Sequence, residues 1–165
     1  MIRLIITMVL TAMLTLGAAA AAHALQVGDP IVLPDIKLHD GSTLRAADLR
    51  GKVVVVEYWA SWCPFCKNTM PHLQQLYDAN KARGLEVIVL SIDKTEREAV
   101  DALRARGFSF RAGMATAELN RVFGRLRGLP VTYVIGRDGR LARQEIGEIF
   151  AEDIAEFARF LAPVR

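Results

Sequence analysis

Cysteine is scarce in this chain: Cys63 and Cys66 are the only two among 165 residues. Two thiols are too few for a disulfide-stapled miniprotein or for a four-cysteine zinc site. Histidine is also rare, and neither His39 nor His72 has the spacing that would complete a zinc site with the two cysteines. The composition argues against disorder, because 52% of the residues are hydrophobic and can offset the entropy lost on folding. We therefore expect one globular domain whose two thiols either carry the chemistry or have no role.

The first 24 residues have the pattern of a targeting segment. A single arginine precedes an uncharged apolar run, and Ala22-His23-Ala24 has the A-x-A form that a signal peptidase accepts. We expect residues 1–24 to be a signal peptide and residues 25–165 to form one domain. The alternative is an uncleaved anchor, because Leu4–Ala22 approaches the roughly 20 residues that span a bilayer. Either form places the domain in the periplasm or another extracytoplasmic space, soluble or tethered.

Acidic residues are sparse in the second half of the chain. Between Arg97 and Arg143 there are ten arginines and only four acids. One interpretation is a basic face that meets an acidic partner. The other is a solvated surface, which the interspersed spacing favours. No aromatic platform interleaves these arginines, so we expect no nucleic-acid partner.

Strand and helix signals alternate after residue 25 and predict a mixed α/β fold, with a central sheet flanked by helices. The β-branched run after Gly51 is typical of a strand buried on both faces. The expected elements are a hairpin turning at Asp40-Gly41, strand Lys52–Trp59, a helix from Pro64 to about Arg83-Gly84, strand Glu86–Ile92, helix Thr95–Arg106, a short helix Ala117–Phe123, strands Val131–Ile135 and Leu141–Ile146, and helix Ala151–Leu161.

Cys63 and Cys66 lie where this buried strand ends and the first long helix begins. Pro64 suits the first helical position, which places Cys63 in the cap region beside free N–H groups and the positive end of the helix dipole. Thiols in such motifs titrate at about 3.5–7.5 instead of about 8.5. Cys66 lies one helical turn on and can close a disulfide with Cys63. We expect Cys63 to exchange with other molecules and Cys66 to resolve the mixed disulfide.

Other roles for the pair are less consistent with the sequence. An inert disulfide would close a loop too short to stabilise the fold much. A copper-binding module would use Cys63 and Cys66 as ligands but lacks a suitably placed third one. A peroxidase is a further alternative, but Cys63 lies inside Trp62-Cys63-Pro64-Phe65-Cys66 instead of following a Pro/Thr-bearing peroxide loop.

With these motifs in order, the chain resembles the thioredoxin superfamily, and within it the TlpA-like group, which includes the cytochrome c maturation thioredoxins. The resemblance covers almost all of the chain after the leader. The matching segments are Gly28–Lys52 as an N-terminal β-hairpin extension, Val53–Cys66 as strand and active site, Pro71 as the proline that kinks the active-site helix, Gly128–Ile135 as the cis-proline loop, and Asp138-Gly139 as the following hairpin.

The resemblance implies that the Leu129–Pro130 bond is cis and stands against the cysteine pair; the residues alone would suggest an ordinary turn proline. Leu129 would then offer its backbone to an extended client segment. Trp62 is expected to form an aromatic rim for docking, and Pro64 and Phe65 to contact the client with it.

Glu57 interrupts the valine run six residues before Cys63, where thioredoxins carry a buried acid and the TlpA-like group often has asparagine. Apolar neighbours should desolvate this carboxyl and raise its pKa. It could then carry the proton exchanged with Cys66. The alternative is that strand alternation points Glu57 into solvent or onto a basic partner.

The sequence therefore predicts an exported protein-disulfide oxidoreductase. The resemblance favours reduction of client proteins in the cell envelope, such as apocytochrome c or proteins with copper-site cysteines, with a membrane thiol–disulfide electron donor. A disulfide-donating oxidase or isomerase is the alternative, because 30 mV corresponds to only about 1.4 kcal/mol for this couple, so small local changes can decide the direction. We expect neither a cofactor nor a bound metal.

Overall fold

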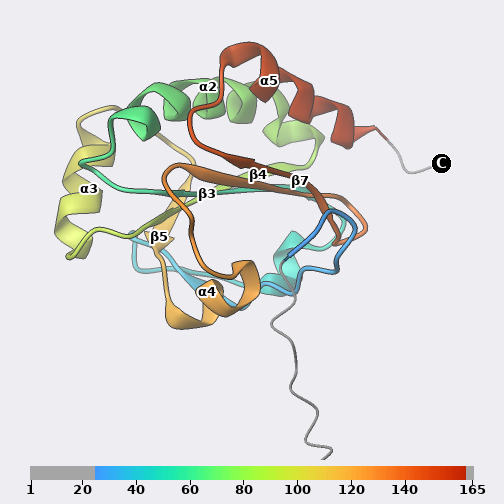
Figure 1. The fold of residues 1–165 in the computed structure, drawn as a ribbon, viewed down its shortest axis with the longest axis horizontal. Helices are drawn as coiled ribbons and strands as arrows, with labels where there is room; N and C mark the ends of the chain where they lie inside the picture. Colours follow the sequence, from blue (N-terminus) through green and yellow to red (C-terminus); the bar gives the residue numbers. More distant parts are fainter. Residues whose placement is uncertain (1–24, 163–165) are drawn as a thin grey trace, which may run out of the picture.

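The computed structural model describes residues 25–162, so the predicted signal peptide and its cleavage site lie outside the described residues. A five-stranded sheet has the order β5-β4-β3-β6-β7, and β1 and β2 form a separate hairpin (Figure 1). The elements are β1 Ile36–Lys37, β2 Thr43–Leu44, the 3-10 helix η1 Ala46–Leu49, β3 Val53–Trp59, α2 Pro64–Asn80, the 3-10 helix η2 Lys81–Arg83, β4 Leu85–Ser91, α3 Glu96–Arg104, β5 Arg111–Met114, α4 Ala117–Phe123, β6 Val131–Ile135, β7 Leu141–Ile146, α5 Ala151–Ala155 and the 3-10 helix η3 Glu156–Leu161. This is the predicted mixed α/β fold with an N-terminal β-hairpin.

Strand β3 lies at the centre of the sheet, and all of its residues are buried. It runs parallel to β4 and antiparallel to β6. Tyr58, near the end of β3, lies opposite Val131, the first residue of β6. The loop that precedes β6 is therefore brought to the end of β3 from which the cysteine motif continues.

The two faces of the sheet bury separate apolar clusters, because successive side chains of a strand point to opposite faces. Val55 and Trp59 pack with residues of α2, α3 and α5. Val56 and Tyr58 pack with α4 and the N-terminal segment on the other face. Figure 1 shows α2 and α5 over one face and α4 beneath the other. Both cysteines belong to the cluster under α2.

The helix ends carry capping interactions. Thr95 and Glu98 form a reciprocal capping box at the start of α3. Helix α2 continues through Pro71 and is extended by η2. Gly84 ends it with φ +87°, a left-handed conformation that glycine adopts without a steric cost. Among residues 25–162, no helix has the length and apolar character needed to cross a membrane.

Strand β5 was not predicted, because its sequence Arg-Ala-Gly-Met lacks the β-branched residues typical of strands. It pairs with β4 at the edge of the sheet, and Gly113 in turn forms a bridge with Leu38 of the hairpin segment. A Cβ atom on Gly113 would lie 2.5 Å from the Lys37 carbonyl oxygen. Glycine is therefore required there for the hairpin to close over the sheet edge.

The last predicted helix is only partly correct. Helix α5 ends at Ala155, and the chain then follows the 3-10 helix η3. Ile154 and Phe157 are still buried, since a spacing of three residues suits both helix types. Ala162 precedes a proline and is extended, with φ −61° and ψ 145°, because the proline ring disfavours the helical conformation of the residue before it.

Candidate active site

Cys63 and Cys66 form a disulfide at the start of α2. Cys63 is the N-cap residue, and its Sγ accepts a hydrogen bond of 3.2 Å from the Cys66 backbone N–H. Pro64 occupies the beginning of the helix, as predicted. Cys66 is fully buried and Cys63 is 3% exposed. The sulfur of Cys63 therefore lies among the unpaired N–H groups of the first turn, where a thiolate is stabilised.

A buried carboxyl holds the loop that precedes the cysteines. Asp93, just beyond β4, accepts hydrogen bonds from the Ser61 backbone N–H at 3.0 and 3.1 Å and from the Ser61 hydroxyl at 2.8 Å. The Ser91 hydroxyl also donates to Asp93, at 2.7 Å. Sequence reasoning missed Asp93. The available signal was its position after a buried strand parallel to β3, since the ends of parallel neighbours meet at one edge of the sheet.

The cis-proline loop is where the resemblance placed it. The Leu129–Pro130 bond is cis, Pro130 is buried and Leu129 is half-buried. The pairing of Tyr58 with Val131 places Pro130 beside the end of β3 and hence beside the loop that carries Cys63.

The segment between β7 and α5 forms a third part of the site, which the sequence did not reveal. Gly147 N–H donates to the Pro130 carbonyl at 2.8 Å. Ile149 N–H donates to the Thr69 hydroxyl at 3.4 Å, and Asn68 donates to Glu148 at 2.8 Å. These bonds connect the segment to both the cis-proline loop and the first turns of α2.

Exposed apolar side chains lie on the segments that border the disulfide. Trp62 and Phe65 beside the cysteines, and Ile146 and Phe150 at the two ends of the third segment, are each more than half exposed. Trp59, in contrast, is buried in the core. Contiguous patches of such groups are typical of surfaces that contact other proteins. Trp62 and Phe65 thus have the exposure that their predicted docking role requires.

Glu57 points to the same face of the sheet as the disulfide, because it alternates with Val55 and Trp59 of that cluster. It is fully buried, and burial raises the pKa of its carboxyl to about 8, partly opposed by a hydrogen bond from Thr132. The Thr132 hydroxyl donates to Oε2 at 3.2 Å. Oε1 is buried without a hydrogen-bond partner among the described residues. The solvent-exposed alternative for Glu57 is therefore wrong.

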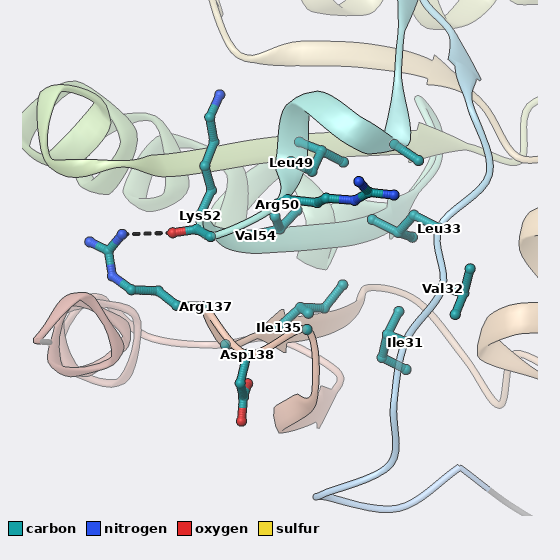
Figure 2. A pocket seen from close by; sticks show the side chains of 14 residues that line it. Ile31, Val32, Leu33, Leu49, Arg50, Lys52, Val54, Ile135, Arg137 and Asp138 are labelled. Atoms are coloured by element: carbon teal, nitrogen blue, oxygen red, sulfur yellow. Dashed lines mark hydrogen bonds between the residues drawn. The ribbon is translucent and has the colours of Figure 1, made fainter. Parts of the chain in front are cut away.

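Two further features of the described residues do not belong to this site. Within residues 25–162, no three His, Cys, Asp or Glu side chains are grouped to hold a metal ion. A pocket of about 340 Å³ lies between the N-terminal segment and the turn after β6. Figure 2 shows the side chains that line it. Its walls include Val54 and Ile135, which pair at the opposite end of the strands from Tyr58 and Val131. This pocket is therefore remote from the disulfide.

The sequence and the fold are both similar to those of known thiol-disulfide oxidoreductases. The AhpC/TSA family model matches residues 27–144. The thiol-disulfide oxidoreductase ResA of Bacillus thuringiensis (strain Al Hakam) is 27% identical over 152 residues, which cover 89% of this chain and 85% of ResA. ResA of Oceanobacillus iheyensis is 29% identical over 145 residues, covering 84% and 74% of the two chains. A crystal structure from Chlorobium tepidum, assigned as the thiol:disulfide interchange protein DsbE, superposes with a TM-score of 0.74 at 26% identity, covering 84% of this chain and 98% of that one.

Proposed function

The chain belongs to the AhpC/TSA family and is a protein-disulfide oxidoreductase, and we propose that it reduces disulfides of client proteins outside the cytoplasm. The observation that carries the proposal is the Cys63–Cys66 disulfide at the start of α2, bordered by the cis-proline loop and an exposed apolar rim. This arrangement presents a reactive sulfur and a backbone edge to the same incoming segment.

Reduction begins with attack of the Cys63 thiolate on one sulfur of the client disulfide. A Cys63–client mixed disulfide forms, and the other client sulfur leaves as a thiolate that takes a proton. Cys66 gives its thiol proton to the Glu57 carboxylate and attacks Cys63 Sγ, which releases the second client thiolate. Two electrons have then passed to the client, and Cys63–Cys66 is a disulfide again. A dithiol donor must reduce this disulfide before the next cycle.

The buried position of Cys66 supports this division of roles. Cys63 is the N-cap residue and borders the rim, whereas Cys66 has no exposed surface. An incoming disulfide therefore meets Cys63 first. The pKa of Glu57, about 8, is close to the ordinary thiol pKa of about 8.5. A proton can therefore pass between carboxylate and thiol at little free-energy cost.

The resemblance supports the choice of in vivo direction and of clients. We propose apocytochrome c, or proteins with copper-site cysteines, as clients in the cell envelope, and a membrane thiol–disulfide protein as electron donor. The leader-like pattern of residues 1–24 supports export. The relatives named as thiol-disulfide oxidoreductases support the type of reaction.

Substrate trapping in the native cell envelope tests this proposal. The C66S variant keeps the attacking thiol but cannot resolve the mixed disulfide, so client proteins should accumulate on Cys63. The matched control is C63S/C66S, which should trap nothing. Alkylation of the wild-type protein in cells should find the pair mainly reduced.

Either of two outcomes would contradict the proposal. A predominantly oxidised resting pair would indicate a disulfide donor. Absence of trapped proteins, together with rapid sulfenylation of Cys63 by hydrogen peroxide, would indicate a peroxidase.

A further inference from the structure

A basic groove lies beside the cis-proline loop, on the face of the sheet opposite α2. It encloses about 1110 Å³ and is lined by the N-terminal segment, the end of α4, the loop Gly124–Arg127 and strands β6 and β7. Arg121, Arg125 and Arg127 line it, against one acid, Asp29. The redox chemistry described above uses none of these residues.

The three arginines are free to meet an external anion. All three are exposed, and within residues 25–162 no ion pair or hydrogen bond involves their side chains. Other arginines of the chain form ion pairs with carboxylates; Arg143, for example, contacts Glu156 at 3.0 Å. Exposed arginines without a carboxylate partner leave a positive potential over the groove.

The local backbone holds two of these arginines in place. Leu126 packs into the apolar cluster under the sheet, while Arg125 and Arg127 on either side of it are exposed. Contact of Leu126 with that cluster therefore anchors the loop that carries both guanidinium groups.

The groove is continuous with the redox site. Val131 and Ile146 both line it, and they lie opposite each other where β6 and β7 meet the cis-proline loop. Pro130 directly precedes Val131, and its carbonyl accepts from the N–H of Gly147, which follows Ile146. A client segment lying on the Leu129 backbone would thus extend from the disulfide towards the arginines.

We propose that this groove binds an acidic segment of the client, next to the client's reactive cysteine. The inference rests on the proposed function and adds the charge of the partner. Complementary charge acts mainly on association, raising on-rates by about 10- to 1000-fold at low salt. Residues 1–24 contain no Asp or Glu, so the chain's own leader lacks the charge that these arginines require.

Matched peptides test the proposal. Each carries one cysteine in a mixed disulfide with 5-thio-2-nitrobenzoate, with glutamates on one side of the cysteine or glutamines at the same positions. Release of the coloured thiolate by the reduced protein gives the rate constant. At low salt we expect the glutamate peptide to react about 10-fold faster, and the difference to vanish near 1 M salt, where the Debye length is about 3 Å.

Two double variants distinguish an effect of the groove arginines on the rate from an effect of the protein's net charge. R125Q/R127Q should remove the preference for glutamate and leave the rate with the glutamine peptide unchanged. R97Q/R104Q, on α3 at the other face of the sheet, changes the charge equally and should keep the preference. Equal rates for the two peptides with the wild-type protein, or equal loss in both variants, would overturn the groove proposal. Failure to react with either peptide would instead contradict the proposed function.

Discussion

At the scale of single residues, the proposed proton-carrier role of Glu57 depends on its burial. Its carboxyl is desolvated within the sheet, so at neutral pH it is mostly protonated, and it becomes a base as the pH rises through about 8. The raised pKa therefore means that this residue's contribution to stability is lost as pH rises towards 8.

The E57Q variant should slow resolution of the mixed disulfide. Without the carboxylate, we expect the rate above pH 8 to fall about 100-fold, and the rise in rate through pH 8 to disappear. Stopped-flow measurement across pH 6–10 checks this. T132V is the matched control: it keeps the acid but removes the hydrogen bond that lowers its pKa, so the rise should move to higher pH. An E57Q profile identical to that of the wild type would exclude the proton-carrier role.

Asp93 acts on the site through Ser61. The D93N variant replaces one oxygen acceptor by an NH₂ group, which leaves at least one of the donors on Ser61 and Ser91 without a partner. We expect the free energy of unfolding of the oxidised protein to fall by about 1–3 kcal/mol. Chemical denaturation measures this, and thiol exchange with a small disulfide should slow in parallel. The S91A variant removes one donor and should lower the free energy of unfolding by less. Equal stability of D93N and wild type would show that Asp93 does not hold the loop.

At the scale of elements, the start of α2 could be predicted from the sequence because its signals are local. The buried valine run, Pro64 and the two cysteines are neighbours in the chain, and the cap geometry follows from them. The segment 146–150 and β5 could not be predicted in the same way. Gly147 and Ile149 are placed by hydrogen bonds to the distant Pro130 carbonyl and Thr69 hydroxyl, and β5 depends on a hairpin closing over Gly113.

At the scale of the whole molecule, the site is assembled at one end of the sheet, where the cysteine loop meets the segment after β4, the cis-proline loop and the segment between β7 and α5. The parallel pairing of β3 with β4 brings Asp93 to the cysteine loop, and the antiparallel pairing with β6 brings Pro130 there. The resemblance supplied the cis-proline in advance, since sequence alone does not specify which proline bonds are cis. The basic groove became visible only in the fold, because its arginines and the N-terminal segment are far apart in sequence.

The central claim is that the start of α2 activates Cys63 as the attacking thiol. The pH dependence of iodoacetamide alkylation in the reduced protein, with each cysteine followed by mass spectrometry, tests it most directly. We predict that Cys63 reacts first, with a pKa in the range of about 3.5–7.5, and that buried Cys66 reacts more slowly and at higher pH. Preferential alkylation of Cys66, or a Cys63 pKa at the ordinary value of about 8.5, would contradict the account.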